Sequence, residues 1–247
     1  MKVNIIFSRK NENAITDANI LMFLFKKIKH TIDTKFVDSE SFKCDNATMN
    51  IFIGIVNPLL IYYAKTNILL FDDAIFPKAN LYTLRDIDYV FTKTEEISRL
   101  LQDTVSKNKI VNIGWRSTDL NSSNQHREYN KFLLFCYDKS QISLYQKIIR
   151  GWNNEERLQG QDGPSLHVVN YHLTQIPESE ITNKSIFIEK GISQEQFETI
   201  FNKYATHICL DEHFNFSHYL NQSMLCKSLV LVPNGKVREF AGGDYAF

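Results

Sequence analysis

The sequence predicts an α/β protein made of two parallel-sheet domains. Its 247 residues suit two compact units of about 100 to 150 residues better than a single small core. Short β-rich runs alternate with segments of helical periodicity along the chain, which favours parallel sheets covered on both faces. The stretch 119–129 contains almost no apolar residue and divides this alternation. We therefore expect domains at 1–124 and 125–247.

The first half begins with the β-rich run KVNIIF, which predicts a strand over 2–7. Polar residues over 8–17 predict a loop, and apolar residues at helical spacing then predict a helix over 18–30. The same alternation predicts strands over 34–37, 49–55, 68–71, 89–92 and 109–113, and helices over 58–65 and 94–102. This half is therefore expected to form an open parallel sheet with helices on both faces.

The second half repeats this pattern, although no sequence repeat relates it to the first. We expect strands over 131–137, 166–170, 185–188, 207–210 and 229–232, and helices over 142–152, 193–204 and 216–226. Ser193 and Gln196 have the spacing of a capping box, which supports a helix start at that point. Each half thus has the size and rhythm of a Rossmann-like domain, and two such sheets facing each other would bind ligands at their carboxyl edges.

Composition excludes several classes of function. Lys plus Arg and Asp plus Glu both number 28, so the net charge is zero and we expect no nucleic-acid partner. Four widely separated cysteines and an N-terminus that starts as a strand favour the cytoplasm. The most apolar stretch, 51–71, is interrupted by Asn57, Pro58, Lys65 and Asn67, so we expect no transmembrane segment.

Local motifs exclude further chemistry. The chain contains no G-x-G-x-x-G, no P-loop and no G-x-S-x-G, which argues against dinucleotide redox, P-loop phosphoryl transfer and nucleophilic hydrolysis. Asp86 and Asp88 have a metal-compatible spacing but are interpreted as flanking the next strand. Asp72 and Asp73 end a predicted strand, where they would either line a cleft or form a turn.

No metal site is expected from the four ligand-type side chains between residues 207 and 218, because their convergence is not implied by the spacing. They are interpreted as core or loop residues, and are His207, Cys209, His213 and His218. The loop 211–215 leads directly into the helix predicted from 216, and a helix start favours a bound phosphate, although this signal is common.

The stretch HICLDEHFNFSHYLNQSMLCKSLVLVP over 207–233 resembles the donor-binding segment of retaining GT-B glycosyltransferases. Four other segments resemble pieces of the same family in the same order: the run from 56 that ends in DYVFTKT over 88–94, NIGWRSTDL over 112–120, FLLFCYDKS over 132–140 and PSLHVV over 164–169. The resemblance implies two Rossmann-like domains facing a cleft, with a C-terminal domain that is short or truncated.

The resemblance also implies a function. It implies transfer of a sugar from a nucleotide-sugar co-substrate, a UDP- or GDP-sugar, to a glycan, protein or small-molecule acceptor, with no tightly bound cofactor or metal. The donor-binding residues it implies are Lys139, Asn215, Ser217, His218, Asn221, Gln222, Gly235 and Glu239. The expected acceptor-side cleft residues are Asp17, Asp72 and Asp73, and no catalytic residue is assigned.

The chemistry-bearing positions depart from the family pattern. The two acids of its E-x7-E element fall on Phe214 and Gln222, and its glycines fall on Asn215 and Ser217. A neutral amide at Gln222 binds ribose hydroxyls more weakly than a carboxylate does. These departures keep two alternatives open. One is a catalytically degenerate module that binds a glycan, nucleotide or partner protein, and the other is an unrelated two-domain α/β binding protein.

Overall fold

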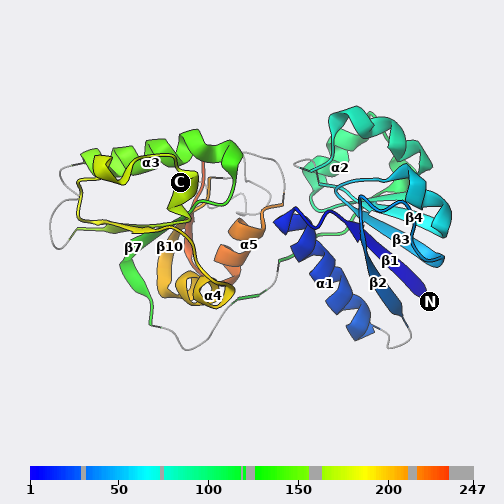
Figure 1. The fold of residues 1–247 in the computed structure, drawn as a ribbon, viewed down its shortest axis with the longest axis horizontal. Helices are drawn as coiled ribbons and strands as arrows, with labels where there is room; N and C mark the ends of the chain where they lie inside the picture. Colours follow the sequence, from blue (N-terminus) through cyan, green and yellow to red (C-terminus); the bar gives the residue numbers. More distant parts are fainter. Residues whose placement is uncertain are drawn as a thin grey trace. The chain divides into compact units, whose positions relative to one another are not determined.

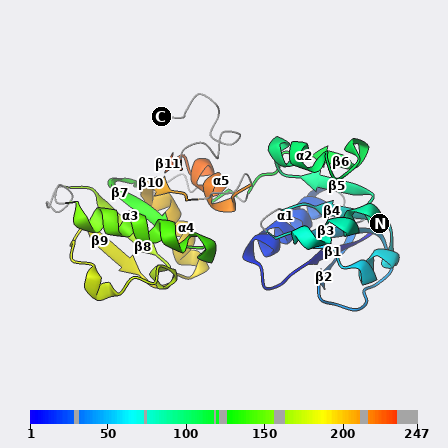
Figure 2. The ribbon, with the colours of Figure 1, turned by 90° about the horizontal axis from the view of Figure 1, so that it is seen from above.

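The computed structural model describes residues 1–28, 32–72, 75–117, 119–120, 126–155, 163–210 and 216–233. Contacts divide these residues into two compact units. Unit 1 holds the described parts of 1–117 together with 216–218, and unit 2 holds those of 119–210 together with 219–233. Both units are drawn in Figure 1 and, turned by a quarter, in Figure 2.

Unit 1 is built on a parallel sheet. Within its described residues the sheet has six strands in the order β2-β1-β3-β4-β5-β6, and every neighbouring pair is parallel. The strands are β1 (Lys2–Phe7), β2 (Asp33–Asp38), β3 (Ala47–Ile53), β4 (Ala64–Leu70), β5 (Tyr89–Thr92) and β6 (Ile110–Asn112). The central strands bury apolar side chains on both faces, as a sheet covered on both sides requires. Among these side chains, Asn4, Asn50 and Asn67 are also buried and are hydrogen-bonded to one another.

Helices cover the two faces of this sheet, with α1 and α2 on opposite sides (Figure 1). On one face, Phe52 and Leu69 pack with Leu60, Leu84 and Ile97 in a single core. The helical segments of unit 1 are α1 (Glu12–Ile28), η1 (Pro58–Tyr63), η2 (Lys78–Asp86), α2 (Glu95–Leu101) and η3 (Lys107–Lys109), where η denotes a 3-10 helix.

Unit 2 contains a second parallel sheet. Its described residues give five strands in the order β11-β10-β7-β8-β9. The strands are β7 (Glu128–Phe135), β8 (Ser165–Val169), β9 (Ile186–Glu189), β10 (Tyr204–Ile208) and β11 (Leu229–Leu231). The helical segments are η4 (Lys139–Gln141), α3 (Ile142–Asn154), η6 (Tyr171–Leu173), η7 (Glu178–Glu180), α4 (Gln194–Lys203) and α5 (His218–Leu225), of which His218 alone belongs to unit 1.

Two cores sandwich this second sheet. Tyr145 and Ile149 of α3 pack with Leu166 and Val168 on one face. Phe201 of α4 and the α5 residues Tyr219 and Leu220 pack with Leu133 and Val169 on the other. Figure 1 shows α3 on one side of the sheet and α4 and α5 on the other. Consecutive residues such as Leu133 and Leu134 of β7 are both buried but belong to different cores, as expected for a strand with helices on both faces.

The structure confirms the expected α/β class, with two parallel sheets each flanked by helices. Two element predictions were wrong. The helix expected over 18–30 begins at Glu12, so Asp17 lies in a helix and not in a loop. The helix expected over 58–65 is the shorter 3-10 helix η1, because the chain joins β4 from Ala64 and pairs there with β3. In the described ranges, no helix combines the length and apolarity needed to span a bilayer.

Candidate functional site

The carboxyl edge of the unit 1 sheet carries a group of buried polar side chains. Asp72 follows β4, Lys93 follows β5 directly, and Trp115 follows β6. Asp17 lies in α1, which connects β1 to β2. Because the carboxyl ends of parallel strands meet at one edge, residues from four segments converge there. This is the edge at which open α/β sheets bind ligands.

Lys93 is the centre of this group. Its Nζ donates to Asp17 Oδ2 at 2.6 Å and to Asp72 Oδ2 at 2.9 Å. The three side chains are almost fully buried, with exposed fractions of 4% for Lys93, 0% for Asp17 and 5% for Asp72. Buried charges are tolerated only when they are paired in this way.

Asp17 accepts two further hydrogen bonds. Trp115 Nε1 donates to its Oδ1 at 2.7 Å, and His218 Nε2 lies 3.0 Å from the same oxygen. The second ring nitrogen of His218, Nδ1, lies 2.9 Å from Ser117 Oγ. We call these six residues, Asp17, Asp72, Lys93, Trp115, Ser117 and His218, the edge cluster. All of them belong to unit 1.

The charges of the edge cluster stabilise one another. Burial alone would raise the pKa of Asp17, but the Lys93 charge and the hydrogen bond with His218 outweigh burial and hold that pKa below its usual value. Burial would likewise lower the pKa of Lys93, but the charges of Asp72 and Asp17 raise it above its usual value. Both groups are therefore ionised around neutral pH.

Local structure fixes the lysine in place. Thr94 caps α2 by accepting a hydrogen bond from Ile97 N, so the chain turns into a helix immediately after Lys93. The Thr92 and Ser98 hydroxyls are also hydrogen-bonded to each other. On the neighbouring strand, the carbonyl of Asp72 accepts from the amides of Ile75 and Phe76. These turns hold Lys93 and Asp72 at the strand ends.

In unit 2, Lys139 lies at the corresponding edge of the second sheet. It begins η4, which follows β7 and leads directly into α3. Asp138 caps this turn by accepting from Ser140 N at 2.8 Å and from Ser140 Oγ at 2.7 Å. The Lys139 side chain is exposed. It is therefore accessible to an anionic ligand at the start of a helix, where the backbone also favours negative charge.

The other donor-binding candidates are divided between the two units. Asn221 and Gln222 lie on α5 in unit 2, and Gln222 is largely buried. Ser217 is half-buried and belongs with His218 to unit 1. The structure therefore brings the candidates Asp17, Asp72 and His218 together in the edge cluster. Asp73, Asn215, Gly235 and Glu239 lie outside the described residues, as do His213 and Phe214.

Two other side chains considered as possible metal ligands, His207 and Asp88, have structural partners. His207 is fully buried and its Nδ1 lies 2.7 Å from Ser223 Oγ. Asp88 Oδ2 accepts from Asn67 N at 2.7 Å, which ties the start of β5 to β4. Across the described ranges, no group of three or more His, Cys, Asp or Glu side chains is arranged to hold a metal ion.

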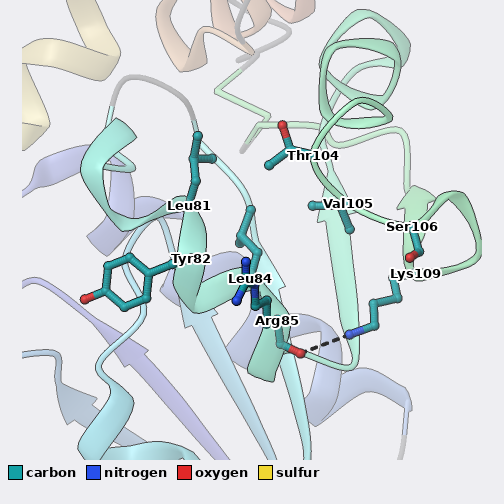
Figure 3. Close-up of a pocket in the computed structure, with 8 residues that line it drawn as sticks. All are labelled: Leu81, Tyr82, Leu84, Arg85, Thr104, Val105, Ser106 and Lys109. Carbon is teal, nitrogen blue, oxygen red and sulfur yellow. Dashed lines mark hydrogen bonds between the residues drawn. The ribbon is translucent and has the colours of Figure 1, made fainter.

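A surface hollow of about 470 Å³ lies elsewhere in unit 1, between η2 and the segment that joins α2 to β6 (Figure 3). Lys109 is held there, because its Nζ donates to the carbonyls of Arg85 and Ile87 at 3.2 and 2.8 Å. None of the residues that line this hollow belongs to the edge cluster. We therefore assign no chemistry to it.

Sequence reasoning missed Lys93, Trp115 and Ser117. All three lie within segments that resemble the glycosyltransferase family, 88–94 and 112–120, but the resemblance gave them no role. The available signal was their place directly after predicted strands, at the ligand-binding edge of a parallel sheet. Position alone did not show that Lys93 would pair with two carboxylates.

Comparisons with known proteins give matches in structure only. A scan of protein-family models finds no match, and neither does a search of curated proteins. Among solved structures, the UDP-GlcNAc 2-epimerase of Methanocaldococcus jannaschii is similar, with a TM-score of 0.61 and 14% identity, over 100% of this chain and 88% of that one.

Two other solved structures hold nucleotides. An alpha-glucosyltransferase in complex with UDP and a 13-mer DNA has a TM-score of 0.59 and 9% identity, over 97% of this chain and 81% of that one. The UDP-GlcNAc 2-epimerase of Neisseria meningitidis, bound to UDP-GlcNAc, has a TM-score of 0.55 and 13% identity, over 84% and 77%. At such identities the likeness concerns the fold alone. With two helix-flanked parallel sheets and these structural neighbours, the chain has the GT-B fold.

Proposed function

We propose that this protein is a glycosyltransferase that moves a sugar from a UDP- or GDP-sugar to a glycan, protein or small-molecule acceptor. The observation that carries the proposal is the edge cluster, in which Lys93 and His218 both contact the buried Asp17 at the carboxyl edge of a parallel sheet. Open α/β sheets bind ligands at this edge. Similar solved structures hold UDP or UDP-GlcNAc, which supports a nucleotide-sugar as the donor. The ordered sequence resemblance to glycosyltransferases supports transfer as the reaction.

Unit 2 supplies the donor side of this proposal. Lys139 is exposed at the end of β7, where its charge would contact the diphosphate of the donor. Gln222 would hydrogen-bond the ribose hydroxyls in place of a carboxylate. Ser143, at the position of a second basic residue in the family pattern, is exposed on α3 and carries no charge. Lys139 is thus the principal cation of the proposed diphosphate site among the described residues.

The proposal predicts that Lys139→Ala weakens donor binding. A charge-assisted hydrogen bond is worth about 1.5–3 kcal/mol, so the dissociation constant of the nucleotide-sugar should rise about tenfold to a hundredfold. Lys147→Ala is the matched control, because Lys147 is also exposed on α3 but lies farther along the helix. Isothermal titration with the donor compares the two variants. Equal affinities in both would contradict the diphosphate role of Lys139.

A second candidate function is binding without turnover, which the uncharged Gln222 and the aromatic Phe214 at the E-x7-E positions favour. Incubation with UDP-glucose, UDP-GlcNAc and GDP-mannose distinguishes sugar transfer from binding without turnover. Release of the nucleoside diphosphate with transfer of the sugar to acceptor or water is expected. Binding without release would favour the degenerate module, and isomerisation of the sugar on an intact nucleotide would contradict transfer.

A further inference from the structure

Three side chains of the edge cluster form a continuous hydrogen-bonded chain. Ser117 Oγ lies 2.9 Å from His218 Nδ1, and His218 Nε2 lies 3.0 Å from Asp17 Oδ1. A hydroxyl, an imidazole and a carboxylate in this order are the arrangement that activates a serine hydroxyl in serine hydrolases. The two ring nitrogens are exchanged here relative to that template, but the order of the three groups is the same.

The partners of Asp17 fix the tautomer of His218. Asp17 is ionised and fully buried, so its oxygens only accept hydrogen bonds. A neutral His218 must then carry its hydrogen on Nε2, the nitrogen that faces the carboxylate. Its Nδ1 is left as an acceptor that faces Ser117. The Ser117 hydroxyl therefore donates to His218, which is the direction that draws the proton away from the serine oxygen.

Two carboxylates and one ammonium group set the charge of the edge cluster. Asp17 and Asp72 carry two negative charges against the one positive charge of Lys93, so the edge cluster with a neutral His218 has an excess of one negative charge. The Phe216 and His218 rings also pack nearly perpendicular to each other, with 5.1 Å between centroids.

The three residues of this hydrogen-bonded chain differ in their exposure to solvent. Asp17 is fully buried, His218 is 8% exposed, and Ser117 is half-buried. Ser117 is therefore the end of the chain that a bound molecule reaches first. We propose that Ser117, His218 and Asp17 form a proton relay that accepts the proton of the acceptor hydroxyl during sugar transfer.

The inference rests on the proposed function. In the proposed transfer step, each bond that forms is matched by a bond that breaks. The acceptor hydroxyl gives its proton to Ser117 Oγ while the Ser117 proton moves to His218 Nδ1. The acceptor oxygen forms a bond to the anomeric carbon, and the bond from that carbon to the donor phosphate breaks. The nucleoside diphosphate leaves with the electron pair. Ser117 touches the acceptor, whereas His218 and Asp17 act through it as positioning residues.

The first test measures the relay without any sugar substrate. A fluorophosphonate forms a bond from its phosphorus to an activated serine oxygen, fluoride leaves, and the histidine takes the proton. Peptide mapping should show Ser117 labelled at least tenfold faster than the exposed Ser140. His218→Gln should abolish this preference, because glutamine keeps a donor for Asp17 but accepts no proton. Labelling of Ser117 no faster than Ser140 would overturn the relay.

The second test measures turnover as nucleoside diphosphate release, with water or a glycan as acceptor. Ser117→Ala and His218→Gln should each lower kcat about a hundredfold, within the usual range for general-base catalysis. Ser117→Ala should leave the dissociation constant of the donor unchanged. Ser179→Ala, a change at an exposed residue of η7, should leave kcat unchanged. Full activity in both relay variants would overturn the inference while the proposed function stands. A wild-type protein that labels at Ser117 but transfers no sugar would instead overturn the proposed function.

Discussion

Lys93 determines the electrostatics of the edge cluster at the scale of single residues. It is the cation that both Asp17 and Asp72 contact, at 2.6 and 2.9 Å. In a buried site, removal of one partner costs more than the pair contributes, because the remaining charges lose their compensation. The cluster is therefore sensitive to the loss of this single side chain.

We expect Lys93→Ala to lower the free energy of unfolding by about 3–5 kcal/mol, since two buried carboxylates would lose the compensating charge of Lys93. The control is Lys10→Ala. Lys10 pairs with Glu40 at 2.8 Å, a comparable distance, but both side chains are more than half exposed. An exposed pair of this kind contributes less than about 1 kcal/mol. Urea unfolding of both variants measures the difference, and similar losses would show that the Lys93 pairs are not buried in solution.

His207 makes stability depend on pH. Burial lowers the pKa of His207 to about 4 in the folded protein, whereas an unfolded histidine titrates near 6.5. Between those values the unfolded state binds a proton that the folded state does not, so stability falls as the pH decreases. Burial also lowers the pKa of His167, and its effect has the same sign.

The expected loss from His207 is about 2 kcal/mol of unfolding free energy between pH 7 and pH 5. Chemical unfolding at the two pH values measures it, and His207→Gln should show a smaller loss because one titrating group is gone. A variant that loses as much stability as the wild type over this range would contradict the burial of a neutral His207.

The residues of the site were only partly predictable. Asp17 and Asp72 were expected on the acceptor side, and the family resemblance implied His218 as a donor-binding residue. Asp17 and His218 are 201 residues apart, so their contact is not local. Lys93 looked like an ordinary charged residue after a strand. Its burial depends on two carboxylates supplied by different segments, which no local pattern encodes.

At the scale of elements, the turn after β3 depends on one glycine. Gly54 has a φ of +66°, and a Cβ added there would lie 2.8 Å from the Ile75 side chain. Its amide donates to the carbonyl of Leu70, which joins the ends of β3 and β4. Since Asp72 follows β4 closely, this turn supports the edge at which the cluster forms.

Gly54→Ala should therefore destabilise the protein by more than about 1 kcal/mol, because the left-handed conformation and the crowding both oppose a side chain. Gly151→Ala is the matched substitution. Gly151 lies in α3 with open space around its Cβ position, so alanine should stabilise that helix by about 0.5–1 kcal/mol. Thermal unfolding compares the two, and the same sign of change in both would contradict this account.

The periodicity of apolar residues predicted which segments are helices and which are strands, but it did not predict several of their boundaries. The start of α1 was placed too late because its first turns are polar and resemble a loop. The side chain of Asn11 accepts a hydrogen bond from Ala14 N, which caps the helix at this earlier point. Buried Ala14 and Ala18 then pack α1 against the sheet. A capping asparagine before a polar first turn was the signal that would have corrected the boundary.

At the scale of the whole molecule, alternation of strands and helices was sufficient to predict the α/β class and the two parallel sheets. The assignment of 216–218 to unit 1 was not predictable, because it depends on which long-range contacts His218 makes. The central claim is that this GT-B fold binds a nucleotide-sugar, with Lys139 on the diphosphate. Fold alone does not settle that claim, so binding must be measured directly.

The most direct test is thermal unfolding against UDP-, GDP- and TDP-sugars and the free nucleotides, with wild type and Lys139→Ala side by side. A ligand at about 100 times its dissociation constant adds about 2.7 kcal/mol, which should raise Tm by about 5–10 °C. We predict such a shift with one nucleotide-sugar, and a smaller shift at the same concentration in the variant. No shift with any of these ligands, in protein shown to be folded, would contradict the account.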